Sequence, residues 1–401
     1  MRADLAARLG QIRWNLHPLW GLAPRVDHKN DGLVESNLLS LSYGQVVRKD
    51  INEIGGLRPD SYETYNIIAP GDTVLRMTDL QNDQRSIRTG LATERGIITS
   101  AYITVRPDGD KVEPRFLHSV LRAYDIKKTF YEMGVGVRQT LKYAELADLP
   151  IPLPPLDTQR AIADYLDRET GEIDAMLAKL DELREQLIQR RLAAVDNEFS
   201  CVGTSSNARL PFVADVIPGL TYSPSDIVDS GGVVVHRAGS VQNSRIDRSD
   251  LVRVSTSIPA KLCIQPGDIL VCTRNGSAHL VGKCAIVGIS EIGETWGAFM
   301  TVLRSQHYRY IYWYMQSSLF AQERKQYFTS TINQLTVGMF SRMMIPFPES
   351  HVQERIADHL DEVTGRIDAM LVKIDELKAL LIERRAALIT DVVTGRKKVP
   401  A

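Results

Sequence analysis

Residue types that could support catalysis occur in this 401-residue chain, but their spacing does not fit the corresponding chemistry. The nearest phosphate loop, GSAHLVGKC at 276–284, has one residue too many between its glycines and ends on Cys284, where a Ser or Thr would bind magnesium. The stretch PDGDK at 107–111 resembles a nuclease carboxylate–lysine arrangement, but it is more typical of a polar hairpin turn. No Asn/Asp-Pro-Pro-Tyr/Phe motif for amino-methylation occurs, and GVGVRQ at 134–139 has too few glycines for a dinucleotide site. We therefore expect this chain not to be an enzyme.

Cysteine usage and hydropathy point to an ordinary protein of the cytoplasm. The four cysteines, at 201, 263, 272 and 284, form no C-x-x-C pair and have no histidine at zinc-finger spacing, so we expect reduced core residues without metal or disulfides. No window approaches 18 uncharged apolar residues, and the first 16 residues are charged throughout, so neither a membrane span nor a signal peptide is expected. The net charge of −1 is uneven, with an acidic first helix and a basic second non-helical region, which permits a nucleic-acid partner without requiring one.

Nearly the same helix is written twice. Alignment of 151–194 with 345–388 without a gap gives 25 identities in 44 positions, which indicates duplication of a domain together with its helix. The regions between the helices contain short β-rich runs, such as GIITSAYITV (96–105) and WGAFMTVLR (296–304), and we expect mixed α/β domains there.

Both helices carry apolar residues at heptad spacing, which predicts a coiled-coil seam. The seam residues are Ile173, Met176, Leu180, Leu183 and Leu187 in the first copy, and Ile367, Met370, Ile374, Leu377 and Leu381 in the second. We expect the two copies to pair with each other, because they share one chain and have self-complementary stripes. The alternative is that the helices dimerise two chains. Two arginine pairs, 190–191 and 384–385, end the seams and are expected either to contact DNA or an acidic partner, or to complement a helix terminus.

The predicted fold class is α+β, with two mixed α/β domains joined by two long helices in an antiparallel coiled coil with an internal pseudo-two-fold axis. The expected boundaries are a first domain at 1–155, a central spacer helix at 156–200, a second domain at 201–349, a C-terminal spacer helix at 350–395 and a tail at 396–401.

The helices keep their sequence while the domains have diverged, which suits a protein that reads two different things. DNA is a natural target, because two unlike domains on a symmetric scaffold would read two unlike half-sites. From Ile173 to Ala194 the helix extends roughly 33 Å, comparable to the roughly 34 Å between major-groove faces one turn apart. The paired helices are thus expected to act as a spacer.

These features together resemble the specificity subunit of type I restriction–modification systems, over essentially the whole chain. The resemblance lies in the repeated Q-x-x-I-A-D-x-L-D-x-x-T-x-x-I-D (159–174 and 353–368), the I-P-L-P and I-P-F-P segments, the P-G-D-I-L turn, and RMTDLQNDQRSIRTGLATERGIITSAYI (76–103). One departure is that the first domain lacks a counterpart of R-N-G-S at 274–277, so the two loops cannot be matched residue by residue.

The resemblance implies two target recognition domains, a double-stranded DNA target, two methyltransferase subunits as partners and restriction–translocation subunits in the full complex. It implies no cofactor on this chain, with S-adenosylmethionine on the methyltransferase and ATP and magnesium on the restriction subunit.

Candidate DNA-contacting residues are polar side chains of the types that bind phosphates and base edges. They are Gln81, Asn82, Gln84, Arg85, Arg88, Arg138, Gln139 and Lys142 in the first domain, and Arg237, Gln242, Asn243, Arg245, Arg274, Asn275, Ser277, His279, Thr329, Thr331, Asn333 and Gln334 in the second. For any single residue, a merely solvated side chain is the commoner outcome.

Two other classes of function remain open from the sequence. A coiled-coil assembly adaptor would bind proteins through its β-rich domains and show no salt-dependent DNA affinity. A self-contained methyltransferase or nuclease is disfavoured, because the search for its motifs is empty.

Overall fold

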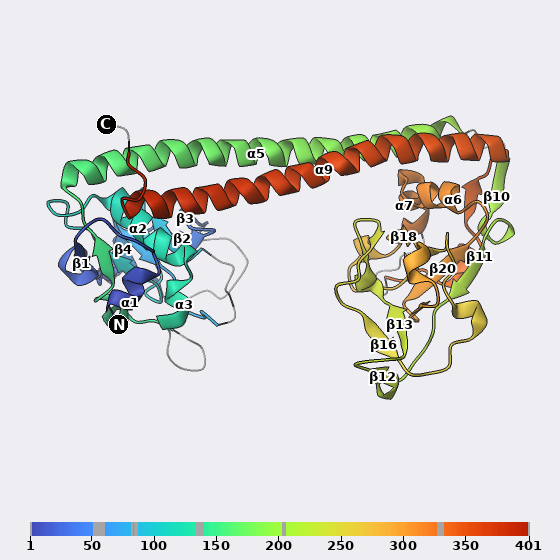
Figure 1. Cartoon of the computed structure of the whole chain (residues 1–401), viewed down its shortest axis with the longest axis horizontal. Coiled ribbons are helices and arrows are strands. Elements are labelled where there is room, and N and C mark those ends of the chain that lie inside the picture. The colour runs from blue at the N-terminus through green and yellow to red at the C-terminus, as the bar shows by residue number, and fades with distance from the viewer. Residues whose placement is uncertain are drawn as a thin grey trace. The chain divides into compact units, whose positions relative to one another are not determined.

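The structure, a computed structural model, describes residues 2–50, 61–81, 83, 87–133, 140–202, 206–326 and 333–399. The chain divides into two compact units: unit 1 comprises Met1–Leu180 and Glu376–Ala401, and unit 2 comprises Asp181–Asp375. The two long helices, α5 (Leu156–Cys201) and α9 (Ser350–Val393), each contribute one part to each unit (Figure 1). The predicted fold class, mixed domains with long helices, is confirmed.

Unit 1 is built from short strands in small antiparallel sheets, in the orders β6-β5-β8, β4-β7, β2-β3 and β1-β9. The strands are β1 (Leu16–Pro18), β2 (Leu39–Ser42), β3 (Gln45–Arg48), β4 (Asn66–Ile68), β5 (Thr73–Leu75), β6 (Thr89–Leu91), β7 (Gly96–Ile98), β8 (Ile103–Val105) and β9 (Pro150–Pro152). The helices besides α5 and α9 are α1 (Arg2–Ala7), α2 (Pro114–Ile126), α3 (Thr129–Met133) and α4 (Tyr143–Leu146).

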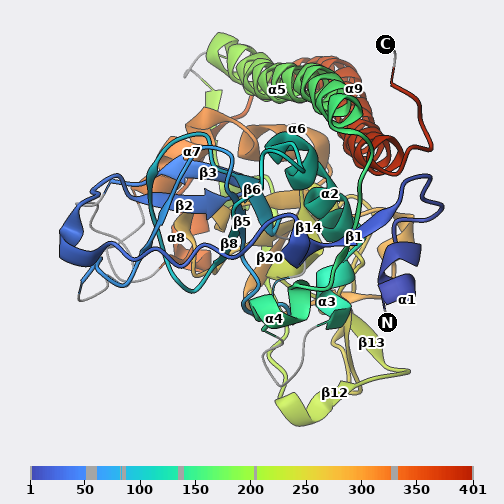
Figure 2. The ribbon, with the colours of Figure 1, turned by 90° about the vertical axis from the view of Figure 1, so that its left-hand side faces the viewer.

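The core of unit 1 forms around α2, which lies between the strands and the C-terminal end of α9 (Figure 2). This helix begins at Pro114, which has no backbone N–H that would need an acceptor. The preceding Glu113 caps the helix, because its carboxylate accepts a hydrogen bond from the Phe116 amide at 2.6 Å. Its buried face packs with Ile162 of α5 and Val392 of α9 in one apolar cluster. Both long helices therefore complete this core.

Unit 2 contains a four-stranded sheet in the order β11-β20-β17-β18, a second in the order β12-β16-β13-β19, and the pairs β14-β15 and β10-β21. The strands are β10 (Asn207–Arg209), β11 (Asp215–Pro218), β12 (Ile227–Val228), β13 (Val233–His236), β14 (Val241–Gln242), β15 (Arg245–Ile246), β16 (Val252–Val254), β17 (Ile269–Cys272), β18 (Cys284–Ile286), β19 (Thr295–Trp296), β20 (Met300–Arg304) and β21 (Met344–Pro346). Its own helices are α6 (Tyr308–Met315), α7 (Ser318–Lys325) and α8 (Val337–Phe340).

Two apolar clusters hold unit 2 together. One joins the sheet and α6 to the long helices, with Phe199 of α5 and Ile356 and Leu360 of α9 buried in it. The other lies between the two four-stranded sheets and includes Trp296 and Val302. Unit 2 therefore also has a core that is completed by both long helices.

The duplication is visible in polar contacts as well as in sequence. In each unit the aspartate of the P-G-D turn is buried and accepts a two-pronged ion pair: Asp72 from Arg106, and Asp268 from Arg304, with shortest distances of 2.7 Å. Such bidentate pairs fix geometry as well as charge. The P-G-D segments at 70–72 and 266–268 therefore form the same structural part in both units.

Each long helix is also fastened to the domain that precedes it by one arginine and two aspartates. The pairs are Arg115 with Asp164 (2.8 Å) and Asp167 (2.8 Å) in unit 1, and Arg309 with Asp358 (2.7 Å) and Asp361 (2.9 Å) in unit 2. The aspartates belong to the repeated motif, so its carboxylates orient the helix against its domain.

The helices run antiparallel within each unit, and ion pairs connect them. In unit 2, Arg184 pairs with Asp375 at 3.5 Å and Arg191 with Asp368 at 3.1 Å, so residue numbers rise along α5 as they fall along α9. In unit 1, Arg385 pairs with Asp174 at 3.1 Å. Because α5 continues to Cys201, Arg191 lies inside the helix, and the interpretation of its arginine pair as helix-terminal charge is wrong.

The predicted seam is buried along one row only. Ile173, Leu187, Ile367, Ile374 and Leu381 are buried and Leu180 is partly buried, whereas Met176, Leu183, Met370 and Leu377 are 45% to 50% exposed. Every seventh residue of a helix returns to within about 20° of the same direction, whereas a residue three positions on points elsewhere. The second row therefore lies beside the seam, which corrects the prediction for those four residues.

Candidate nucleic-acid interface

In unit 1 the structure places two of the predicted contact residues at the surface. Gln81 and Lys142 are exposed, and the Lys142 amide donates to the Glu145 carboxylate at 2.7 Å at the start of α4. Asn82, Gln84, Arg85, Arg138 and Gln139 lie outside the described residues.

Arg88 is a structural residue, and its prediction as a surface contact is wrong. Its exposed fraction is 0%, and its guanidinium donates to the carbonyl of Thr78 at 2.9 Å and to the hydroxyl of Tyr131 at 3.2 Å. It also contacts the Asp83 carbonyl. These acceptors hold the turn before β6, because a buried guanidinium needs a full set of partners.

In unit 2 the folding brings two of the predicted clusters together. Arg274 forms a bridge with Gln334, and the Asn333 side chain donates to the Gly276 carbonyl at 3.0 Å. Asn275 is partly buried, while Ser277 and His279 are exposed on the loop that follows. Thr329 and Thr331 lie outside the described residues.

The third predicted cluster of unit 2 follows β13. Arg237 is exposed and pairs with Asp250 at 3.0 Å, and Gln242 and Asn243 are exposed in the β14–β15 hairpin. Arg245 is the cross-strand partner of Gln242 in this hairpin, and it also lines a different recess together with Trp313 of α6.

Phe299 connects the separate clusters. The Arg274 guanidinium lies over its ring, 5.0 Å from the ring centroid, and the amides of Thr273 and Arg274 donate to the Phe299 carbonyl at 2.9 and 3.2 Å. Its side chain is 55% exposed, and it lines a recess that Arg237 borders from another strand. A guanidinium over an exposed aromatic ring is an arrangement that can contact bases and phosphates.

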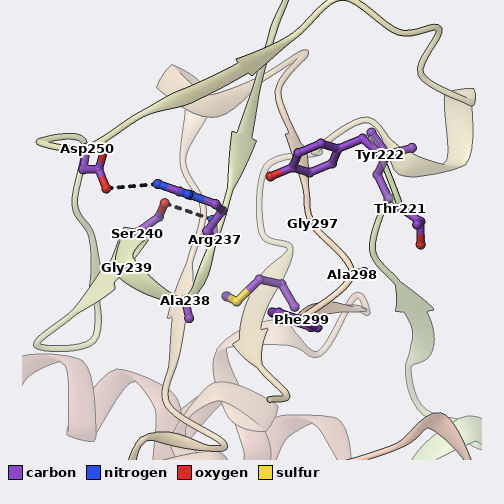
Figure 3. Close-up of a pocket in the computed structure, with 12 residues that line it drawn as sticks. Thr221, Tyr222, Arg237, Ala238, Gly239, Ser240, Asp250, Gly297, Ala298 and Phe299 are labelled. Atoms are coloured by element: carbon purple, nitrogen blue, oxygen red, sulfur yellow. Dashed lines mark hydrogen bonds and ion pairs between the residues drawn. The ribbon is translucent and has the colours of Figure 1, made fainter. Parts of the chain in front are cut away.

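The recess has a volume of about 620 Å³. Its lining residues come from four segments of unit 2: Leu220, Thr221, Tyr222, Arg237, Ala238, Gly239, Ser240, Asp250, Gly297, Ala298, Phe299 and Met300. Figure 3 shows the Tyr222 ring reaching toward the side that carries Arg237, with Phe299 on a third side. The Arg237 amide donates to the Ser240 hydroxyl at 3.1 Å, which fixes the turn beneath the guanidinium.

Close backbone packing keeps this recess open. Gly219 permits the approach of two segments, since a Cβ there would lie 2.1 Å from the Gly297 carbonyl oxygen. The Leu220 and Gly297 backbones form a parallel bridge, and the Gly297 amide donates to the His236 carbonyl at 2.9 Å. The walls are therefore set by main-chain contacts rather than by mobile side chains.

A buried polar network anchors the strand that presents Arg237. The His236 ring is fully buried, and its Nε2 lies 2.7 Å from the Glu294 carboxylate, to which Arg248 donates at 2.7 Å. Burial raises the pKa of Glu294, but the hydrogen bonds with Arg248 and His236 outweigh it, so the pKa lies below its ordinary value. The Glu294 carboxylate therefore stays ionised at neutral pH, and its contacts with Arg248 and His236 tie β13 to the segment before β19.

Sequence reasoning missed Tyr222 and Phe299. Each is a single aromatic residue in a loop, and the two segments meet only through the sheet. The sequence signal that could have found them is an aromatic residue between small residues at the edge of a predicted strand, in WGAFM and GLTYS. The alternation of the strand does not call for an aromatic side chain at either position.

The cysteines differ in their burial. Cys272 and Cys284 are buried and free, as predicted, and burial raises the pKa of the Cys284 thiol to about 12. Cys201 is exposed, so its prediction as a core residue is wrong. Among the described residues, no group of three or more His, Cys, Asp or Glu could hold a metal ion, and no helix there is long and apolar enough to cross a bilayer.

Comparison with known proteins gives a consistent result for both units. The family model described as "Type I restriction modification DNA specificity domain" matches residues 66–185 and again residues 209–379. The specificity subunit of the type I restriction enzyme StySPI from Salmonella potsdam is 26% identical over 198 residues, which are 47% of this chain and 42% of that protein. The specificity subunit of the EcoKI enzyme from Escherichia coli K12 is 27% identical over 192 residues, 46% of this chain and 41% of that protein. The matched stretches thus span less than half of these relatives.

Two solved structures share the fold over nearly their full length. A chain from work on complex assembly and conformational transition of the type I R-M system aligns with a TM-score of 0.73 and 17% identity, covering 95% of this chain and 97% of its own. The HsdS subunit from Thermoanaerobacter tengcongensis aligns with a TM-score of 0.52 and 17% identity, covering 96% and 97%. At such identities the likeness concerns the fold alone.

Proposed function

Because this chain belongs to the family of type I restriction–modification DNA specificity domains, we propose that it is the non-catalytic subunit that selects the DNA sequence for such a complex. Its two domains read the two unlike ends of a bipartite, asymmetric target. The observation that carries this proposal is the combination of a repeated frame with unlike surfaces. The arginine–aspartate contacts recur in both units, whereas the exposed polar loops differ.

Residue chemistry assigns separate tasks within unit 2. Arg274, Asn275, Asn333 and Gln334 form one continuous polar surface with side chains suited to base edges. Arg237 and His279 are the proposed contacts to the phosphate backbone, which fix register but carry no sequence information. In unit 1, Gln81 and Lys142 remain proposed contacts, together with the predicted residues outside the described ranges.

Partner subunits supply the chemistry in this proposal. Two methyltransferase subunits carry S-adenosylmethionine, restriction subunits carry ATP and magnesium, and this chain holds no cofactor. The half-exposed rows, Met176 with Leu183 and Met370 with Leu377, together with the acidic residues around them, are the proposed contact surfaces for the methyltransferases. Apolar rows of this kind are commonly covered in an assembly.

The helix pair is proposed to set the number of base pairs that are not read. Lengthening both helices by one turn adds roughly 6 Å to their length, close to the length of two base pairs at about 3.4 Å each.

Duplex binding tests the proposal against a protein-binding adaptor. The chain, co-purified with its methyltransferase, is titrated with a labelled duplex pool at a series of salt concentrations. We expect an affinity that falls steeply with salt, because phosphate contacts release counterions. The double variant Arg274→Gln with Arg237→Gln removes two of the proposed DNA contacts, so it should weaken binding and make the affinity less dependent on salt. An assembled complex without DNA affinity at low salt would instead support the adaptor.

A further inference from the structure

We propose that the recess of unit 2 between Tyr222, Phe299 and Arg237 receives one nucleobase that has left the DNA stack. This proposal rests on the proposed function and names a ligand for a site within it. It concerns a single unpaired base, distinct from the base edges read in an intact groove.

The first argument is shape. Bases in a duplex lie at the floor of a groove between projecting phosphate rims, so a reading surface must project into the groove. A hollow of about 620 Å³ cannot reach an unperturbed base edge. Its volume is within the range of about 300–1,000 Å³ that small-molecule sites occupy. A base can fill it only after rotating out of the helix, as bases do for enzymes that act on them.

The second argument is the lining. Phosphate sites are made of donors, whereas this recess is lined largely by aromatic, aliphatic and glycine residues. Tyr222 and Phe299 present ring faces or edges on different sides of the hollow (Figure 3). Unstacked bases are held in proteins by stacking on aromatic side chains and on arginine planes. The lining therefore fits a flat heteroaromatic ring better than a sugar or phosphate.

The third argument is charge at the rim. Arg237 lines the recess, and the Arg274 guanidinium lies over the ring of Phe299, another lining residue. Arg237 pairs with Asp250, whose side chain is largely exposed, and such a solvated pair costs little to rearrange. Arg237 is suited to hold a phosphate beside an extruded nucleotide while its base enters the hollow.

The fourth argument is that the frame is built to stay open. The Gly219–Gly297 approach and the buried His236–Glu294 contact fix the walls without any ligand. Preorganisation of this kind lowers the cost of binding.

The experiment is a scan with 2-aminopurine, an adenine analogue whose fluorescence rises on unstacking. Duplexes carrying the target sequence receive the analogue at one position at a time in the half-site of unit 2, and each is bound to the complete complex. We expect an increase at one position in the native protein. Phe299→Ala should reduce this increase and weaken binding of the unlabelled target about tenfold, the order expected for loss of one stacked base.

Two further variants keep the test sharp. Phe212→Ala removes an aromatic ring that is 82% exposed elsewhere in unit 2, so it should leave both readouts unchanged. Gly239→Leu should act like Phe299→Ala by narrowing the recess, since a Cβ at Gly239 has nothing within 4 Å and creates no clash. Thermal unfolding of each variant checks that the unit remains folded.

The outcomes separate this inference from the proposed function. Salt-dependent, sequence-specific binding with a fluorescence increase that persists in Phe299→Ala and Gly239→Leu would assign the unstacked base to the methyltransferase and overturn the recess proposal. The same binding without any fluorescence increase would also overturn it. A complex without DNA binding would overturn the proposed function itself.

Discussion

Arg191 on α5 donates a hydrogen bond to Asp368 on α9 at 3.1 Å. The corresponding residues of the duplicated helices, Arg385 and Asp174, form the same bond at the same distance in the other unit. Each of the two arginine pairs therefore supplies one arginine to the contact between the helices. The sequence had predicted that these pairs contact DNA or a partner, or complement a helix terminus. A duplicated sequence that pairs with itself makes every such contact twice.

The two ion pairs should differ in their contribution to stability. Asp368 and Arg191 are less exposed than Asp174 and Arg385, and the Arg191 guanidinium also lies 5.6 Å from the Trp313 ring centroid. We expect Asp368→Asn to lower the free energy of unfolding of unit 2 by about 1 kcal/mol, and Asp174→Asn to cost unit 1 only a few tenths. Urea denaturation with hydrogen exchange to assign each unit measures both. Equal costs would contradict this ranking.

The helices and their duplication were predictable because their signals are local and repeated. Heptad spacing and 25 identities in 44 positions define the long helices, and short β-rich runs define mixed domains. Burial was harder to predict. Arg88 has the same side chain as a DNA-contacting arginine, and only the packing of α2 and α3 around it makes it internal.

The recess was not predictable, because it depends on which loops the sheets bring together. Tyr222 and Phe299 become neighbours through the bridge between Leu220 and Gly297, a contact that no local pattern encodes. The exposed second row of the helix seam was missed for a similar reason, since heptad spacing does not reveal which row faces the partner helix.

Arg88 provides a direct test of the structural role assigned above. Arg88→Met should destabilise unit 1 by about 3 kcal/mol or more, because the carbonyls of Thr78 and Asp79 lose their buried donor. The matched control, Arg274→Met, changes an exposed side chain and should leave the unfolding temperature nearly unchanged while weakening DNA binding. A stable Arg88→Met protein with an altered target sequence would restore the DNA-contact role of this residue.

His118 on α2 predicts a pH dependence of stability. Burial, together with the positive charge of Arg122, lowers the pKa of His118 to about 3. The folded state therefore keeps this imidazole neutral while the unfolded chain takes up a proton below its ordinary pKa near 6.5. Proton uptake by the unfolded chain therefore lowers the free energy of unfolding as the pH falls from 6.5 toward 3, by at most about 1.4 kcal/mol per pH unit.

The measurement is the free energy of unfolding of unit 1 between pH 7 and pH 5. His118→Gln removes the titrating ring, so its stability should fall less steeply with pH than that of the native chain. Parallel curves for the two proteins would show that another group is responsible.

The spacer role of the helices can be tested without breaking their ion pairs. Four residues are inserted in α5 after Leu180 and four in α9 after Asp375, the positions where the two units divide. Each unit then keeps its own arginine–aspartate pair, and the unread gap in the target should lengthen while both ends stay the same. The same four residues inserted after Asp229, in the exposed loop between β12 and β13, should leave the gap unchanged. An unchanged gap in the helix variant would refute the spacer role.

The central claim is that two unlike domains of one chain read the two ends of one target. Methylation mapping of a genome modified by this chain, co-expressed with its methyltransferase, tests it most directly. The account predicts a motif with two different defined ends and a fixed undefined gap, of which replacement of residues 1–155 by a relative's first domain changes one end only. An active methyltransferase that modifies no such motif, or a replacement that changes both ends, would contradict the account.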